Sequence, residues 1–185
     1  MNGTAALVAL VHESLKLGDD ESIVNHLRVG LCELILKGDA ELPADVFACH
    51  VDRYARRLLH RDDERGFSIV AMAWGPGQGT SLHDHSGMWC VEGVWKGSIE
   101  VQQYELLEQR DARFRFERRG FLRAGTGSAG CLIPPYEYHL IRNPTMAPAG
   151  SVHIYGGNMT SCGVFDPTDR IGWFTRQDKA LTLDL

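Results

Sequence analysis

Residues 77–97 read GQGTSLHDHSGMWCVEGVWKG. It places His83 and His85 two residues apart inside a frame of glycines. On an extended strand, residues i and i+2 face the same side, so both imidazoles can enter one interior while Asp84 points away. The stretch therefore predicts a strand that presents two nitrogen ligands to a metal ion.

A third histidine follows in residues 130–143, GCLIPPYEYHLIRN. His139 stands behind a Pro-Pro turn, four residues before Asn143. Together the two stretches resemble the paired motifs of the cupin superfamily, G-x5-H-x-H-x3/4-E-x6-G and G-x5-P-x-G-x2-H-x3-N. The resemblance implies a mainly β fold, an antiparallel jelly-roll barrel, with one metal ion inside it on His83, His85 and His139.

Two departures from the cupin motifs affect the expected ligands. Most cupins have a metal-binding glutamate four or five residues after the second histidine, where this chain has Trp89 and Cys90, and Tyr136 replaces the glycine of the second motif. We therefore expect three neutral imidazoles to hold the metal, which leaves up to three positions of a six-coordinate ion for substrate and dioxygen. Imidazole also suits zinc, copper and nickel, so the spacing leaves the metal open.

The part of the chain before about residue 50 is predicted to be helical. Apolar residues recur with a period near 3.6 over residues 4–16 and again over 21–36. A pair of aspartates before the second helix can cap its start, and Gly38 suits its end. A short third helix is expected over residues 43–49, because proline fits the first turn of a helix.

From about residue 51 onward the chain changes to short strand-like runs between turn residues. Runs of this kind indicate an antiparallel sandwich or barrel. A chain of 185 residues suits one domain, so we expect a single cupin domain over 1–185, with a helical segment over about 1–50 and a β-barrel with a C-terminal extension over about 51–185. The clearest predicted strands are 67–74, 89–95, 98–106, 130–133 and 151–155.

Charge and composition argue against several classes of partner. A net charge of −5 lacks the basic field that nucleic-acid binding needs. No run of about 18 apolar residues offers a membrane span, and the N-terminal stretch lacks the basic region of a signal peptide. The five cysteines are scattered and none forms a C-x-x-C pair, which favours a reducing compartment. We therefore expect a cytoplasmic protein that binds neither nucleic acid nor membrane.

A narrower resemblance begins at residues 151–155, SVHIY. The S-x-H-x-Y pattern is similar to the Ser-His-Tyr relay beside the metal in the cysteine dioxygenase family, whose members convert cysteine to cysteine sulfinate with iron(II) and dioxygen. A period of two places all three side chains on one face of a strand, so a linear hydrogen-bond chain can form. The resemblance spans about residues 54–166, and its further marks are Tyr54-Ala55-Arg56, Trp74, Cys90, Cys162 and Phe165-Asp166.

The resemblance implies a role for each member of the site. The three histidines would hold iron(II), and the substrates would be a small thiol and dioxygen. Tyr155 would position the substrate through its hydroxyl, His153 would hold that hydroxyl, and Ser151 would hold His153. The family implies no obligate partner chain, so we expect a monomer.

Arg56 is expected to bind the substrate carboxylate, because a guanidinium group matches a carboxylate with two parallel hydrogen bonds. In this family, bacterial members with arginine at that place are associated with cysteine, and those with glutamine with 3-mercaptopropionate. Arg56 therefore favours L-cysteine, although the adjacent Arg57 takes its place if the alignment shifts by one residue. Cys90 matches the position that forms a thioether with the relay tyrosine in mammalian members, so a Cys90–Tyr155 cross-link is a further hypothesis.

Plainer interpretations remain open for each of these residues. Ser151 and His153 could be two buried polar side chains that satisfy each other, Arg56 a surface arginine, and Cys90 a buried free thiol. For the whole protein, the alternatives are a 3-mercaptopropionate dioxygenase, a zinc or nickel cupin isomerase or hydrolase, and a cupin that stores or senses a small ligand.

Overall fold

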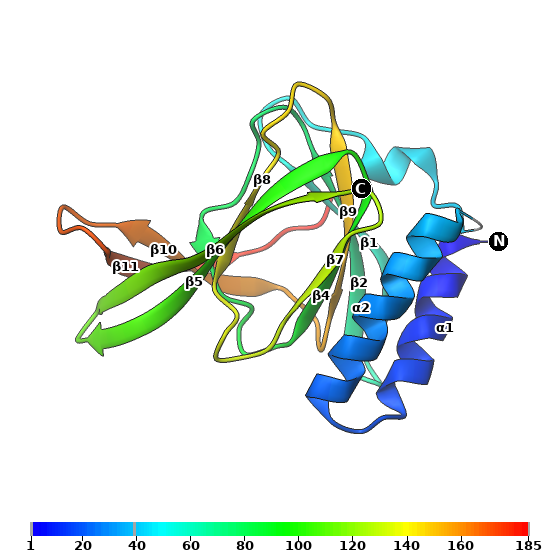
Figure 1. Ribbon diagram of the computed structural model, residues 1–185, viewed down its shortest axis with the longest axis horizontal. Helices are drawn as coiled ribbons and strands as arrows, with labels where there is room; N and C mark the ends of the chain where they lie inside the picture. The colour runs from blue at the N-terminus through cyan, green and yellow to red at the C-terminus, as the bar shows by residue number, and fades with distance from the viewer. Residues whose placement is uncertain (1, 39, 185) are drawn as a thin grey trace.

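The computed structural model describes residues 2–38 and 40–184, and Figure 1 shows two helices packed on one side of a β-structure. The helices are α1 (Gly3–Leu15) and α2 (Asp20–Lys37), followed by η1 (Ala44–Phe47). The first two predicted helices are confirmed, whereas the third is only a short 3-10 turn. Within the described ranges, no helix has both the length and the apolar character needed to cross a membrane.

The ends of α2 follow from its local sequence. Asp19 Oδ1 accepts a hydrogen bond from Ser22 N at 2.9 Å, which satisfies one of the N–H groups that the start of a helix leaves free. At the other end, Gly38 has a left-handed φ of 68°, a conformation that costs glycine little. The predicted caps of α2 are therefore confirmed.

The remaining described residues form an antiparallel jelly-roll barrel. One sheet has the strand order β1-β2-β9-β4-β7, and the other strands pair in a closed ring, β10-β11-β6-β5-β8-β3. The mainly β cupin fold is confirmed. The strands are β1 (Ala55–Asp62), β2 (Phe67–Trp74), β3 (Leu82–His83), β4 (Cys90–Lys96), β5 (Ser98–Arg110), β6 (Arg113–Gly125), β7 (Ala129–Leu132), β8 (His139–Arg142), β9 (Ala149–Tyr155), β10 (Ser161–Pro167) and β11 (Trp173–Ala180).

The β content exceeds the prediction at the end of the molecule away from the helices. There β5 and β6 form a long hairpin with β10 and β11 beside it (Figure 1). β5 runs to Arg110 rather than to residue 106, and β6, which reads RFRFERRGFLRAG, was not predicted. Because most side chains of β6 remain open to solvent, its sequence carries little of the apolar alternation that marks a half-buried strand.

Every residue of β2 and β9 is buried, because both faces of their sheet are covered. On the outer face, Ile69 and Val152 belong to a core with helix residues such as Leu27. On the inner face, Met72 and Tyr155 belong to the core inside the barrel. Since successive side chains of a strand alternate, β9 directs its S-x-H-x-Y residues into the barrel, as predicted.

α2 approaches the outer face of β4 closely at a glycine. A Cβ atom on Gly93 would lie 2.7 Å from Leu31 Cδ2 and 3.1 Å from Ile35 Cδ1. Both side chains are buried between the helices and the sheet, where dense packing leaves them little room to move. The distance between helix and sheet therefore requires glycine at position 93.

Gly93→Ala should lower the free energy of unfolding by about 1–3 kcal/mol, the usual cost of overfilling a packed core. Gly130 is a matched control, because it lies on the neighbouring strand opposite Glu92 and has open space where a Cβ would stand. Gly130→Ala should change the free energy of unfolding by less than about 1 kcal/mol. Urea titration of both variants measures the difference, and equal losses would contradict the packing.

Candidate metal centre

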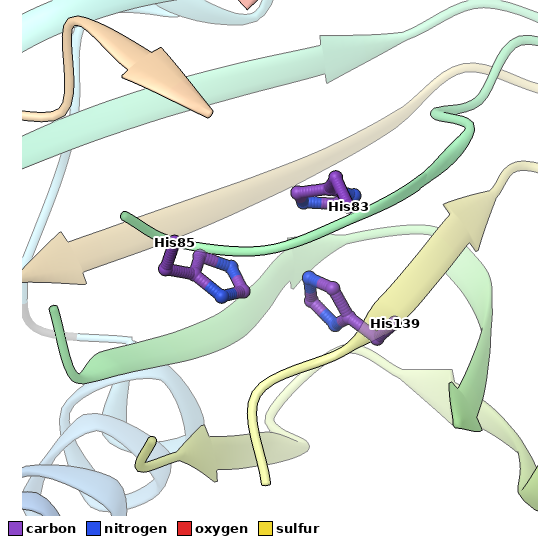
Figure 2. Close-up of side chains that lie close together, drawn as sticks. All are labelled: His83, His85 and His139. Atoms are coloured by element: carbon purple, nitrogen blue, oxygen red, sulfur yellow. The ribbon is translucent and has the colours of Figure 1, made fainter. Parts of the chain in front are cut away.

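Three histidines converge inside the barrel, and we call them the three-histidine cluster. His83 ends β3, His85 follows shortly after it, and His139 begins β8 (Figure 2). His83 and His139 are register partners across β3 and β8. The ring centroids lie 5.2 Å apart for His83 and His85, 4.6 Å for His83 and His139, and 4.9 Å for His85 and His139. Each ring offers one nitrogen within 4.8 Å of the other two, so the predicted residues come together.

Asp84 fixes the turn between the first two histidines. The strand that was predicted to carry both of them ends at His83. Asp84 Oδ1 accepts hydrogen bonds from Gly163 N at 2.8 Å and from Ser86 N at 3.0 Å. The carboxylate is thus engaged by β10, outside the cluster, as the sequence predicted, while the turn keeps His85 inside.

The buried imidazoles of the cluster are suited to a metal ion rather than to protons. Burial lowers the pKa of His83 to about 3 and the pKa of His139 well below its ordinary value, and the neighbouring histidines add to both effects. Neither ring nitrogen of His139 has a hydrogen-bond partner within residues 2–38 and 40–184, although buried polar atoms are normally paired. Neutral imidazoles with free nitrogens are the donors that first-row divalent metals take. The cluster therefore fits such an ion.

The Nδ1 atom of each ring in the cluster lies near an oxygen atom. This arrangement is typical of metal-binding histidines, whose second nitrogen is held by an outer group. The oxygen atoms belong to the Ser81 carbonyl, 3.0 Å from His83, to Glu137 Oε2, 3.7 Å from His85, and to Glu92 Oε1, 3.7 Å from His139.

Glu92 and Glu137 are functional candidates that the sequence analysis did not identify. Both are buried, and burial raises the pKa of Glu92 to about 8. A period of two would have indicated them, because Glu92 follows Cys90 by two residues on β4 and Glu137 precedes His139 by two. The period of two gives the face on which a side chain lies but not its partner, which comes from another segment of the chain.

The predicted relay is present in part. Trp74 Nε1 donates to Ser151 Oγ at 2.8 Å, and Ser151 Oγ lies 2.8 Å from His153 Nε2. The other ring nitrogen of His153 lies 3.4 Å from Glu92 Oε2. Across the described part of the chain no hydrogen bond joins His153 to Tyr155; instead the two rings stack, with centroids 6.1 Å apart. The expected link to the Tyr155 hydroxyl is therefore replaced by a contact with Glu92, because both nitrogens of His153 face other groups.

Arg56 lines the cavity beside the cluster. This cavity also has His83 in its wall. The Arg56 side chain is buried and donates from Nη2 to Met159 O at 3.2 Å. Arg57 Nη1 instead donates to Ala48 O at 2.7 Å, because adjacent residues of β1 point to opposite faces. The structure thus favours Arg56 over Arg57 at the cavity and excludes the surface interpretation of Arg56.

The segment after β11 anchors Arg56. Asp184 Oδ2 accepts a hydrogen bond from Arg56 N at 2.8 Å, and Asp184 N donates to Arg56 O at 2.7 Å. Hydrogen bonds from Arg53 and from the Arg56 backbone help to lower the pKa of Asp184 to about 2, so this carboxylate is charged at neutral pH. The C-terminal extension therefore forms part of the wall that positions Arg56.

Cys90 and Tyr155 lie directly opposite each other. They are register partners on β4 and β9, and both are buried in the core inside the barrel. Burial raises the pKa of the Cys90 thiol and of the Tyr155 phenol well above their ordinary values. Nearby Glu92 adds to both shifts, and Cys90 adds to the shift of Tyr155. Cys162 and Lys179 line the same cavity as Tyr155.

Comparison with known proteins agrees with this geometry. Residues 33–168 match the family model described as Cysteine dioxygenase type I. Cysteine dioxygenase type 1 of Rattus norvegicus is 23% identical over 167 residues, which are 88% of this chain and 78% of that protein. The protein of the same name from Danio rerio is 25% identical over 115 residues, which are 62% and 56% of the two chains.

Solved structures also resemble this chain. One is an uncharacterized conserved protein with a double-stranded β-helix domain from Klebsiella pneumoniae, which is 16% identical, has a TM-score of 0.49 and is matched over 66% of this chain and 89% of that chain. The match to the family model runs from the end of α2 to the end of β10 and covers most of the sequence. The chain belongs to the cysteine dioxygenase type I family.

Proposed function

We propose that this protein is an iron(II)-dependent thiol dioxygenase that converts L-cysteine and dioxygen to cysteine sulfinate. The observation that carries the proposal is the three-histidine cluster, whose nitrogens lie within 4.8 Å of one another beside a cavity with an arginine in its wall. Membership of the family supports the reaction class. Both atoms of dioxygen enter the sulfinate, so the reaction balances without another reductant.

Each residue of the site has a part in this proposal. His83, His85 and His139 would hold the metal. When bound, iron(II) supplies open positions at which a thiol and dioxygen can meet. Arg56 would bind the substrate carboxylate. Burial keeps the Tyr155 phenol protonated, so its hydroxyl could donate a hydrogen bond into the cavity.

Ser151 and His153 would act from the wall of the cavity, which His153 lines, rather than on the substrate thiol itself. Their hydrogen bond to each other, and that from Trp74 to Ser151, join β2 and β9 at the wall that carries Tyr155. Buried polar groups that satisfy one another rigidify the part of the core they occupy. This wall would hold Tyr155 in place while substrate enters and product leaves.

We also propose a monomeric enzyme of the cytoplasm. All five cysteines are free, which fits a reducing compartment.

A second candidate is the oxygenation of 3-mercaptopropionate, which has the carboxylate of cysteine but no amine. Within the described part of the chain, the residues that line the cavity include the cations Arg56 and Lys179 but no aspartate or glutamate. A carboxylate would therefore find complementary charge there, whereas an ammonium group would not. The charges that line the cavity therefore favour 3-mercaptopropionate over L-cysteine.

Oxygen uptake distinguishes these proposals. Iron(II)-loaded protein would be given L-cysteine, 3-mercaptopropionate or cysteamine in parallel, and the sulfinate product quantified. Uptake matched by sulfinate with L-cysteine as the best substrate supports the first proposal, and preference for 3-mercaptopropionate supports the second. No thiol-dependent uptake would contradict both and favour a cupin isomerase, hydrolase or ligand-binding protein.

Arg56→Ala should raise KM about thirty-fold for thiols that carry a carboxylate, because it removes a charge-assisted hydrogen bond worth about 2 kcal/mol. The KM for cysteamine, which has no carboxylate, should change little. Arg57→Ala is the matched control, since the Arg57 guanidinium donates to carbonyls away from the cavity. Steady-state kinetics of both variants with all three thiols make the comparison; an equal effect of Arg56→Ala on every thiol would contradict carboxylate binding.

The register of Cys90 and Tyr155 supports a thioether between them. Its formation removes one hydrogen from the thiol and one from the phenol ring, and the two electrons would pass to the dioxygen that the enzyme uses. Intact-mass measurement after many turnovers should show the loss of two hydrogens in wild-type protein and none in Cys90→Ala. An unchanged wild-type mass would leave Cys90 as a buried free thiol.

A further inference from the structure

Two buried carboxyl groups, those of Glu92 and Glu137, lie next to the three-histidine cluster. Within residues 2–38 and 40–184, the nitrogen groups of side chains within 4.0 Å of the Glu92 carboxyl group are the imidazoles of His139 and His153. For the Glu137 carboxyl group, it is the imidazole of His85. Neither glutamate has a lysine or arginine at that distance in the same ranges. Burying a carboxyl group is costly unless it is paired, so these two positions need an explanation.

Another buried glutamate of the barrel shows the ordinary arrangement. Glu100 on β5 is as buried as Glu92, but it receives hydrogen bonds from Arg123 at 2.8 Å and Arg142 at 3.0 Å. Two cations offset its burial. In the described part of the chain, Glu92 and Glu137 have imidazoles where Glu100 has arginines, and two of these three imidazoles belong to the cluster.

Glu137 holds His85 through both its backbone and its ring. Glu137 Oε2 accepts a hydrogen bond from His85 N at 2.7 Å and lies 3.7 Å from His85 Nδ1. His85 lies beyond the end of β3 and outside its pairing with β8. Glu137, in the segment that leads into β8, therefore connects the unpaired ligand to the strand of His139.

Glu92 lies between a ligand of the cluster and the buried wall of the cavity. Its Oε1 is 3.7 Å from His139 Nδ1, and its Oε2 is 3.4 Å from His153 Nδ1. His153 is bonded in turn to Ser151, which accepts from Trp74. A continuous row of polar contacts thus runs from Trp74 on β2 to His139 on β8.

We propose that Glu92 and Glu137 are positioning residues of the metal centre. They hold the Nδ1 side of His139 and His85, as the Ser81 carbonyl holds that of His83, so that the Nε2 nitrogen of every ring is left for the metal. The metal centre then consists of three imidazole ligands, two of which have a carboxyl group on their Nδ1 side. The inference rests on the proposed function only in taking the three histidines as metal ligands.

Metal affinity tests the proposal without reference to turnover. Cobalt(II), which is stable in air, would be titrated into metal-free wild type, Glu92→Gln, Glu137→Gln and the control Glu100→Gln, in competition with a chelator. The two positioning variants should bind cobalt(II) about 10- to 100-fold more weakly than wild type, the usual effect of losing an outer partner of a ligand. Glu100→Gln should retain wild-type affinity.

The ligand geometry is read from the cobalt(II) absorption bands. These bands should shift in Glu92→Gln and Glu137→Gln but not in Glu100→Gln, because only the first two change how a ligand is held. Glu92→Asp keeps the carboxyl group on a side chain that is one methylene group shorter. Its affinity for cobalt(II) should therefore lie between those of wild type and Glu92→Gln. The melting temperature of each metal-free variant separates positioning from folding.

The outcomes that contradict the proposal differ from those that contradict the function. Wild-type affinity and absorption in Glu92→Gln and Glu137→Gln would overturn the proposal alone. A lower melting temperature of the metal-free variants with unchanged affinity would also overturn it, since the glutamates would then be structural. Failure of the wild type to bind cobalt(II) would overturn both this proposal and the metal-dependent function.

Discussion

The pairing of β3 with β8, which sets His83 opposite His139, is the contact on which the site depends. It joins two segments 56 residues apart, and it is short because β3 consists of Leu82 and His83 only. Pairing of β3 with β10 on its other side closes the ring of strands. The metal ligands are thus placed by the same pairings that close the barrel, and the barrel interior around them is buried.

That burial explains the polar groups around the cluster. Removing water from an imidazole or a carboxyl group is unfavourable unless another group takes the place of the water. Here the replacements are side chains of the barrel interior: Ser151 for His153, Glu92 for two imidazoles and Glu137 for His85. The cavity beside them has cations in its wall. The three-histidine cluster is therefore suited to a metal ion, and the cavity is suited to a carboxylate.

Sequence predicted the features that depend on spacing within one segment. The helix caps at Asp19 and Gly38, the direction of the β9 side chains, and the convergence of three histidines follow from periods of 3.6 and 2 or from a short motif. The choice of Arg56 over Arg57 needed the structure, because it depends on which face of β1 meets the cavity.

Features that depend on contacts between segments were missed or wrong. Glu92 and Glu137 lie on predictable faces, but their partners come from other segments of the chain, and a single sequence does not show such pairs. The expected bond from His153 to the Tyr155 hydroxyl was wrong for the same reason, because Glu92 of β4 occupies the second nitrogen of His153. The charged strand β6 escaped detection because its partner β5, rather than an apolar core, stabilises much of it.

In the proposed enzyme, the three-histidine cluster holds one catalytic iron. Iron content would be measured in protein that has been loaded with iron(II) and freed of excess metal, for wild type, His139→Ala and His26→Ala, which changes an exposed histidine of α2. We expect one iron per chain in wild type and His26→Ala and almost none in folded His139→Ala, because only the last variant removes a ligand. Equal iron in all three proteins would contradict it.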